Sequence, residues 1–294
     1  MAVPGAIGII GGSGLYAMPE MEVHETREIE TPFGKPSDRF VMGTLTGVHV
    51  VFLSRHGRGH RVVAPGVNYR ANIFGMKTLG VDTLISVNAV GSMHESYHPT
   101  DIVIPDQFFD NTRGRQSTFF PDCPAVHVDI ADPVCGVLSG VLFESCREVG
   151  ARAHLGGICF CIEGPSFSTR AESKIYRSLG ADIIGMTSAT EAKLSREAEM
   201  CYASLSMVTD YDVWKEKAED VTTELILSNM LKTVDTAREV LKKAIPGVPA
   251  ERVCRCRSAL RNAIATDPAV VPNETRVRLE PLLGKYLPPG EQVV

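Results

Sequence analysis

The sequence has little of what membrane proteins and nucleic-acid-binding proteins usually carry. Its 294 residues contain no apolar run of about 18 residues, so we expect no transmembrane helix. Lys and Arg total 30 against 35 Asp and Glu, which is not the basic excess of a nucleic-acid-binding surface. The first residues have neither the charged start nor the apolar stretch of a signal peptide, so we expect a cytoplasmic protein.

Cysteine spacing typical of a metal site is also missing. The eight cysteines include two close pairs, Cys159/Cys161 and Cys254/Cys256. Neither pair has the C-x-x-C spacing of a structural zinc site, and neither has nearby histidines to complete one. We therefore expect free, mostly buried thiols and no bound metal, with a local disulfide between Cys254 and Cys256 as the alternative.

Two kinds of apolar pattern alternate along the first two thirds of the chain. Short and nearly continuous apolar runs, typical of strands covered on both faces, occur at Ala6–Ile10, Val48–Leu53, Thr83–Val87, Asp101–Ile104, Gly157–Ile162, Asp182–Ile184 and Tyr202–Val208. Helical patterns occur between them, at about Tyr69–Gly80, Pro133–Gly150, Thr169–Leu179 and Glu191–Glu199. The alternation predicts a layered α/β fold.

The last third of the chain is mainly helical in pattern. Thr222–Ala244 is a long amphipathic segment that we expect to end before Pro246. Ser258–Ala265 and Glu274–Tyr286 are further helical segments. Because no linker-like composition separates them, we expect residues 1–294 to form a single domain, with the helices of about 222–294 packed on the sheet.

A glycine-rich turn follows the first apolar run. In Gly11-Gly12-Ser13-Gly14, glycines let backbone N–H groups approach an anion and Ser13 adds a hydroxyl donor. The segment also fits the dinucleotide fingerprint G-x-G-x-x-A, but Pro19 interrupts the helix that this fingerprint needs. We favour a small-anion loop over a plain tight turn.

Three more predicted strands end in polar residues. Ser54–His60, Ser86–Ser92 and Gly185–Ser188 all place hydroxyls, amides or cations after an apolar run. Ligands bind at the carboxyl ends of strands in α/β sheets, and arginine is suited to holding phosphate oxygens. Four such strand ends predict one convergent anion site.

These segments, in this order, resemble the trimeric purine nucleoside phosphorylase superfamily, and within it the 5′-methylthioadenosine phosphorylases. The similarity runs from Ile7 to about Trp214. It is carried by Gly11–Gly14, Thr31–Asp38, Arg55–Arg58, Asn68–Asn72, Glu163–Glu172 and Thr209–Asp212. The resemblance implies one domain with a central twisted mixed sheet flanked by helices. It also implies a homo-oligomer, a trimer or a dimer of trimers, that uses inorganic phosphate as a co-substrate and needs no cofactor.

The resemblance also implies roles for particular residues. The phosphate site would consist of Ser13, Arg55, His56, Asn88, Ala89 and Thr187. The nucleoside would contact Phe167, Met186, Asp210, Asp212, Thr223, Ile226, Leu227 and, from a neighbouring subunit, His127. Two positions depart from the family pattern: Asn88 stands where many methylthioadenosine phosphorylases have threonine, and Thr190-Glu191 stands where a Pro-Glu pair is usual.

Asp210 and Asp212 are the predicted catalytic residues. Phosphorolysis needs an anion beside the anomeric carbon and a group that helps the purine leave. A buried Asp210 could serve the leaving purine if its pKa were raised. An ionised carboxylate accepts hydrogen bonds and so suits an adenine amino group.

The predicted reaction is therefore the phosphorolysis of 5′-methylthioadenosine to adenine and 5-methylthioribose 1-phosphate. One alternative is a phosphorylase of broader or 6-oxopurine specificity, acting on methylthioinosine, inosine or guanosine. The others are a hydrolytic nucleosidase and a nucleoside-binding protein without turnover.

Overall fold

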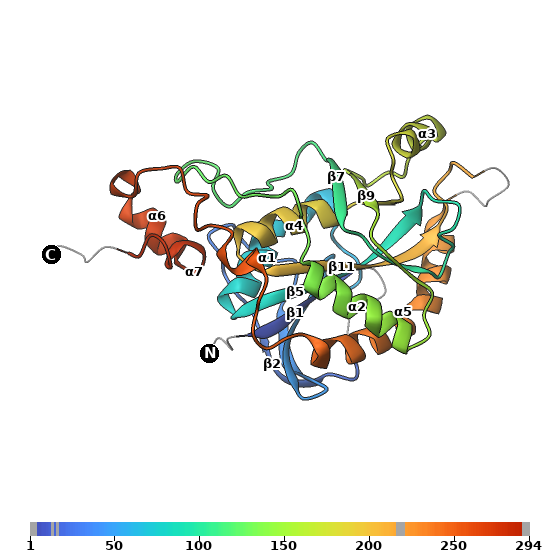
Figure 1. The fold of residues 1–294 in the computed structure, drawn as a ribbon, viewed down its shortest axis with the longest axis horizontal. Coiled ribbons are helices and arrows are strands. Elements are labelled where there is room, and N and C mark those ends of the chain that lie inside the picture. The colour runs from blue at the N-terminus through green and yellow to red at the C-terminus, as the bar shows by residue number, and fades with distance from the viewer. Residues whose placement is uncertain (1–4, 13–14, 16–17, 216–220, 290–294) are drawn as a thin grey trace.

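A computed structural model describes residues 5–12, 15, 18–215 and 221–289 of the chain (Figure 1). Ser13, which we predicted to bind phosphate, lies outside these residues. None of the helices in the described part of the chain is long and apolar enough to cross a membrane.

The centre of the molecule is an 11-stranded mixed sheet, which confirms the predicted fold class. The strands are β1 (Ala6–Gly11), β2 (Glu22–Arg27), β3 (Phe40–Leu45), β4 (Val48–Ser54), β5 (Val81–Ser92), β6 (Ile102–Ile104), β7 (Gln107–Asn111), β8 (Ala153–Leu155), β9 (Ile158–Ile162), β10 (Ile183–Gly185) and β11 (Cys201–Asp210). Their main path is β2-β3-β4-β1-β5-β10-β9-β7, and β11 also pairs with β5 and continues to β6 and β8.

The sheet opens along one side of the long central strand β5. Strand β1 runs parallel to β5 and pairs with it as far as Val87. Strand β10 pairs with the same side of β5, antiparallel, at Gly91 and Ser92. Among the described strands, none pairs with residues 88–90 of β5 on that side, so β1 and β10 diverge there. The divergence leaves room for a ligand in the middle of the sheet.

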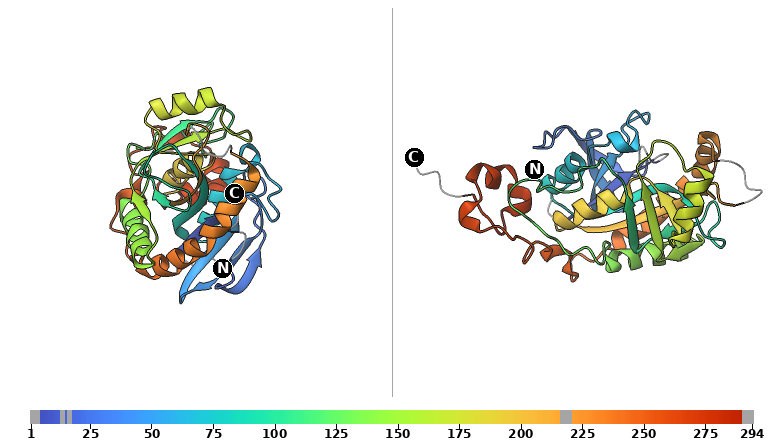
Figure 2. Two further views of the ribbon diagram at one scale, coloured as in Figure 1. Left: turned by 90° about the vertical axis from the view of Figure 1, so that its right-hand side faces the viewer. Right: turned by 90° about the horizontal axis from the view of Figure 1, so that it is seen from above.

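Helices cover both faces of the sheet (Figures 1 and 2). They are α1 (Tyr69–Thr78), α2 (Gly136–Glu148), α3 (Arg170–Ser178), α4 (Ser188–Glu197), α5 (Thr223–Gly247), α6 (Asn273–Arg278) and α7 (Glu280–Leu283), with short 3-10 helices η1 (Ala64–Gly66), η2 (Arg255–Ser258) and η3 (Pro268–Val270). Alternate residues of β1 enter different core layers: Ala6 and Ile10 pack with α1 and α4, whereas Ile7 and Ile9 pack with α2 and α5. This double coverage explains the continuous apolar runs.

Several predicted boundaries were wrong. α5 continues through Pro246 to Gly247, because a proline in the last turn removes few helical hydrogen bonds. Ser258–Ala265 is not a helix: after η2 the chain makes successive i to i+3 turns. The segment Glu274–Tyr286 is split into α6 and α7, because Pro281 cannot continue a helix from the preceding turn.

The C-terminal helices pack in two places. α5 lies against β11 and α2, as expected for a helix on the sheet. α6 and α7 lie beyond α1 at the end of the molecule opposite α3 (Figure 1). Leu279 between them and Leu282 and Leu283 of α7 join the same core as α1. They extend that core rather than cover a sheet face.

Candidate active site

A cavity of 620 Å³ lies where β1 and β10 diverge from β5. Its lining comes from the ends of β4, β5, β10 and β11, from the loop after β9 and from the first turns of α5. Twelve of the predicted site residues line it: Arg55, His56, Asn88, Ala89, Phe167, Met186, Thr187, Asp210, Asp212, Thr223, Ile226 and Leu227. The structure therefore brings together segments that are up to about 170 residues apart, as the convergence of strand ends predicts.

Arg55 follows the last residue of β4 and is fully buried. Its guanidinium pairs with Glu191 of α4, with Nε 2.5 Å from Oε1 and Nη2 3.2 Å from Oε2. Nη2 also donates to Ser86 Oγ at 2.6 Å, and Nη1 donates to the Val87 carbonyl at 3.1 Å. The cation that we predicted to hold phosphate is thus already neutralised by a buried carboxylate.

Glu191 is the main residue that sequence reasoning missed. Besides Arg55, it accepts hydrogen bonds from Ser86 Oγ at 2.6 Å and from the Tyr202 hydroxyl at 3.2 Å. A fully buried carboxylate with so many donors fixes the floor of the cavity. The sequence singled out Glu191 only as part of the Thr190-Glu191 pair that stands where a Pro-Glu pair is usual, and no role was predicted for it.

The Asn88 side chain is also engaged within the protein. Its Nδ2 donates to Ser188 Oγ at 3.1 Å and to Ser204 Oγ at 2.5 Å, and its Oδ1 accepts from Ser86 Oγ. Both amide hydrogens are therefore used, and Asn88 holds the end of β5 in place more than it offers a free donor. Thr187 Oγ1 lies 3.4 Å from Asn88 Oδ1, so a hydroxyl borders the same part of the cavity.

Gly12 lets the glycine loop approach the buried arginine. A Cβ at this position would lie 2.7 Å from Arg55 Nη1 and 2.7 Å from the Val87 carbonyl oxygen. Both contacts are too short for any side chain, so only glycine fits between β4 and β5 here. The close approach places the loop backbone beside the guanidinium, as an anion site requires.

His56 is a neutral imidazole at the edge of the cavity. Its Nδ1 lies 2.8 Å from the Val62 carbonyl, which makes Nδ1 the protonated nitrogen. Burial, together with the neighbouring Arg55 cation, lowers the pKa of His56 to about 4. The ring also stacks on His60 with centroids 4.4 Å apart.

His56 should make the fold less stable in acid. The unfolded pKa is about 6.5 and the folded pKa is about 4, so the neutral form contributes stability that is complete above pH ~6.5 and is lost as the pH falls toward ~4. We expect the unfolding free energy of the His56→Gln protein to fall by about 2–3 kcal/mol less than that of the parent over this pH range. Urea unfolding of both proteins at several pH values measures it, and parallel pH profiles would contradict it.

Asp210 and Asp212 form the opposite wall. Asp210 ends β11 and is buried, with Oδ2 accepting from Thr209 Oγ1 at 2.7 Å and Oδ1 from the Asp212 N–H at 2.8 Å. Burial raises the pKa of Asp210. Asp212 has a left-handed backbone with φ 50°, and its buried Oδ2 has no hydrogen-bond partner. Such an acceptor calls for a donor from a ligand.

Gly91 makes room for Asp210. A Cβ on Gly91 would lie 2.8 Å from Asp210 Oδ1 and 2.9 Å from Ile184 Cγ2. The sequence predicted this glycine only as part of a strand end. The structure shows why glycine is needed at this position: a larger residue would displace the Asp210 carboxylate.

Arg115 holds the loop that carries Phe167. Its side chain is nearly fully buried, and its Nε donates to Glu163 Oε1 at 2.9 Å. Its other nitrogens donate to the Glu163 carbonyl at 2.7 Å, the Tyr69 hydroxyl at 3.1 Å and the Met186 carbonyl. One arginine thus connects the loop after β9 to α1 and to the strand end that carries Met186 and Thr187.

Removing Arg115 should weaken nucleoside binding. Because Arg115 does not line the cavity, we expect Arg115→Ala to raise KM for the nucleoside by about tenfold, with a smaller change in kcat. Steady-state kinetics measures both constants. Arg113→Ala is the matched control, since Arg113 is exposed and bonds Glu163 only through its backbone N–H. Equal effects of the two substitutions would contradict the positioning role.

The remaining predicted residues lie at the open side of the site. α5 begins at the N-cap Thr222, whose hydroxyl accepts from the Leu225 N–H, and this cap places Thr223, Ile226 and Leu227 along the cavity. Leu227 and Phe167 are 44% and 42% exposed in the single chain. His127 is exposed and is not part of the cavity lining; its N–H donates to the Ala263 carbonyl.

Residues 6–246 match the phosphorylase superfamily. This chain belongs to that superfamily. It is 52% identical over 282 residues to a protein of Geobacter sulfurreducens named S-methyl-5'-thioadenosine phosphorylase, with 96% of this chain and 99% of the relative covered. A relative from Koribacter versatilis with the same name is 51% identical over 97% of both chains.

Solved structures of similar proteins show the same fold. A methylthioadenosine phosphorylase from an antarctic soil metagenomic library superposes with a TM-score of 0.90 at 45% identity, covering 95% of this chain and 99% of the other. Methylthioadenosine phosphorylase from Schistosoma mansoni, solved in complex with adenine, has a TM-score of 0.85 at 35% identity, covering 89% and 99%. The predicted superfamily membership is therefore confirmed.

Proposed function

We propose that this phosphorylase superfamily member splits 5′-methylthioadenosine with inorganic phosphate, giving adenine and 5-methylthioribose 1-phosphate. The named relatives and the solved neighbours support this reaction. The cavity supports it independently, because it combines buried carboxylate acceptors, a polar floor that includes the Arg55 side chain, and an apolar side formed by α5.

The single observation that carries the proposal is the unpaired Oδ2 of Asp212 beside Asp210. An adenine amino group donates hydrogen bonds and would satisfy this buried acceptor. A 6-oxopurine would instead place a carbonyl oxygen against the Asp212 carboxylate and leave its Oδ2 unpaired. Mismatches of this kind discriminate strongly between substrates. The acceptors therefore favour 6-aminopurine nucleosides over inosine or guanosine.

Asp210 is the proposed catalytic acid. Its raised pKa, caused by burial, makes the protonated form more accessible than for an exposed aspartate. In the proposed reaction a phosphate oxygen bonds to the anomeric carbon as the bond from that carbon to the purine nitrogen breaks. The Asp210 proton passes to the departing purine, which leaves without a full negative charge.

The phosphate would be held mainly by hydrogen bonds. Arg55 and Glu191 form a neutral pair and His56 is neutral, so the described residues around this part of the cavity present donors rather than a free positive charge. The Thr187 hydroxyl, which borders this part of the cavity, completes the proposed set. Hydrogen bonds would orient the phosphate toward the sugar, and no unpaired positive charge of these residues would bind it strongly.

The apolar part of the lining supports a methylthio group at the 5′ end. Val221, Ile226 and Leu227 line the cavity near the start of α5. They offer van der Waals contact to a thioether and no hydrogen bond to a 5′-hydroxyl. We therefore propose that methylthioadenosine is preferred to adenosine.

Product analysis tests this function. The protein is incubated with methylthioadenosine, adenosine or methylthioinosine, each with and without phosphate, and free base and sugar phosphate are quantified. We expect adenine and 5-methylthioribose 1-phosphate only when phosphate is present, with methylthioadenosine the fastest. Equal adenine release without phosphate would instead indicate a hydrolytic nucleosidase, and binding without base release a non-enzymatic protein.

We also propose that the active enzyme is a cytoplasmic homo-oligomer, a trimer or a dimer of trimers, whose sites each take His127 from a neighbouring subunit. None of the eight cysteines, all of them in the described part of the chain, is joined in a disulfide, which is the state that a reducing compartment favours. The exposure of Phe167 and Leu227 at the cavity supports a subunit contact there, and the exposure of His127, outside the lining of its own cavity, leaves that side chain available to a neighbour. Light scattering gives the oligomeric state. Mixing a His127→Ala chain with an Asp210→Ala chain should restore activity that neither has alone, and a full-activity His127→Ala protein would refute the shared site.

A further inference from the structure

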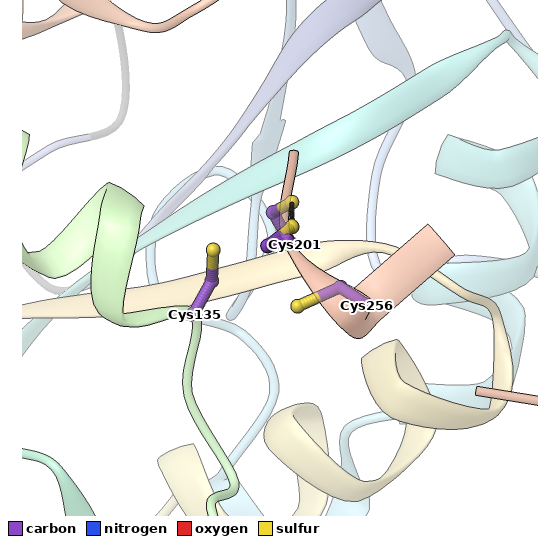
Figure 3. Close-up of side chains that lie close together, drawn as sticks. Cys135, Cys201 and Cys256 are labelled. Atoms are coloured by element: carbon purple, nitrogen blue, oxygen red, sulfur yellow. Dashed lines mark hydrogen bonds between the residues drawn. The ribbon is translucent and has the colours of Figure 1, made fainter. Parts of the chain in front are cut away.

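Four cysteines meet at one point away from the cavity. The sulfurs of Cys135, Cys201, Cys254 and Cys256 all lie within 4.8 Å of one another, and Cys201 Sγ is 3.3 Å from Cys254 Sγ. Figure 3 shows the side chains of Cys135, Cys201 and Cys256 lying close together on three different segments. Cys135, Cys201 and Cys256 are buried, and Cys254 is partly buried. None of the four lines the active-site cavity.

Three distant segments supply these side chains. Cys135 is the N-cap residue of α2, Cys201 is the first residue of β11, and Cys254 and Cys256 are at the start of η2. This explains why the spacing of the pairs in sequence predicted no metal site: a four-ligand set is formed only when the chain folds.

Hydrogen bonds unrelated to sulfur hold the segments in place. The Cys135 N–H donates to the Tyr202 carbonyl at 2.8 Å, which fixes the start of α2 on β11. Arg252 Nη1 donates to the Glu199 carbonyl at 2.7 Å, and Glu199 Oε1 accepts from the Leu260 N–H at 3.0 Å. These backbone and side-chain hydrogen bonds position the segments that carry the four cysteines independently of any bond between the sulfurs.

The spacing of the sulfurs suits a tetrahedral ion. Zinc bound by four thiolates has bonds of about 2.3 Å, which place the sulfurs about 3.8 Å apart. The observed separations of 3.3 Å for one pair and at most 4.8 Å for any pair span this value. Small rotamer changes would be enough to close the site.

The surroundings also suit a negatively charged cluster. The side chain of Arg196, a buried residue of α4, has its Nη1 3.9 Å from Cys256 Sγ. A zinc ion with four thiolates carries two net negative charges, and a buried guanidinium partly offsets them.

We propose that Cys135, Cys201, Cys254 and Cys256 bind one zinc ion as a structural site. Binding is redox-neutral: one Zn²⁺ replaces four thiol protons, which are released to solvent, and four Zn–S bonds form. The ion would fix the segment after α5 onto β11 and α2. Pairing of the same cysteines as disulfides would instead require an oxidant such as dioxygen.

Cobalt titration tests the site directly. Reduced, metal-free protein is titrated with Co²⁺ and then with Zn²⁺, and the absorption spectrum is recorded. We expect one Co²⁺ per chain with the sulfur-to-cobalt charge-transfer bands and tetrahedral d–d bands of a four-thiolate site, displaced by one equivalent of Zn²⁺. Absence of stoichiometric uptake would overturn the proposal. So would native protein whose four cysteines are joined as disulfides in peptide mapping.

Substitutions separate this cluster from the other thiols. Cys135→Ser/Cys256→Ser should abolish the charge-transfer bands, weaken Zn²⁺ binding by at least tenfold and lower Tm of the zinc-loaded protein. Cys123→Ser/Cys146→Ser is the matched control, because both residues lie outside the cluster. Equal loss in both double variants would refute the assignment. The cobalt absorption spectrum reports thiolate coordination directly, so it tests the site even in a variant with a lower Tm.

Discussion

Replacing Asp210 with asparagine is expected to lower kcat/KM for methylthioadenosine by about 10²–10⁴-fold, the usual contribution of a general acid. The fold should tolerate the change. The asparagine oxygen can still accept from the Asp212 N–H, and its amide can donate to Thr209 Oγ1, a hydroxyl that also accepts. The loss would therefore report on chemistry at the purine and not on unfolding.

The same substitution should change which base is preferred. Asparagine supplies an N–H donor that a 6-oxopurine can accept, so the rate with methylthioinosine relative to methylthioadenosine should rise. Rates with both nucleosides, measured side by side, give this ratio. Asp235→Asn, an exposed site on α5, is the control. An unchanged ratio would show that Asp210 does not face the purine edge.

Disrupting the Arg55–Glu191 pair is expected to cost the fold about 3–5 kcal/mol. Both side chains are 1% exposed, so Glu191→Ala would leave a buried guanidinium without its carboxylate. It would also deprive Ser86 and Tyr202 of an acceptor. Urea unfolding followed by circular dichroism measures the loss of unfolding free energy. A change below about 1 kcal/mol would show that the pair is not formed as described.

A double substitution distinguishes stability from binding. Arg55→Met/Glu191→Leu removes both charges, and apolar replacements of buried ion pairs are often neutral or stabilising. We expect this variant to regain much of the unfolding free energy while its phosphate KM stays far above that of the parent. If phosphate-dependent activity returned with stability, Arg55 would be a structural residue only.

The fold was predictable where the sequence pattern reflects burial. β1, β4, β5 and β11 are covered on both faces and appear as apolar runs. β2 was missed because all of its residues are exposed or only partly buried, so no periodicity marks it as a strand. It is held by pairing with β3 at the edge of the sheet, a contact between residues that no local pattern reveals.

The site was predictable for a related reason. Its residues follow strand ends, and topology brings strand ends together. Supporting residues were not predictable, because Glu191 and Arg115 act through contacts with segments 136 and 71 positions away. Their importance depends on burial and on hydrogen bonds, and neither can be predicted from a single charged residue in the sequence. The cysteine cluster was hidden in the same way.

The most direct measurement is a crystal structure of the protein with adenine and phosphate. We expect the adenine amino group to lie within hydrogen-bond distance of the Asp212 carboxylate, and the phosphate to lie between Gly12 and Thr187. Adenine bound with its amino group turned away from both aspartates, or phosphate bound outside the cavity, would contradict this expectation.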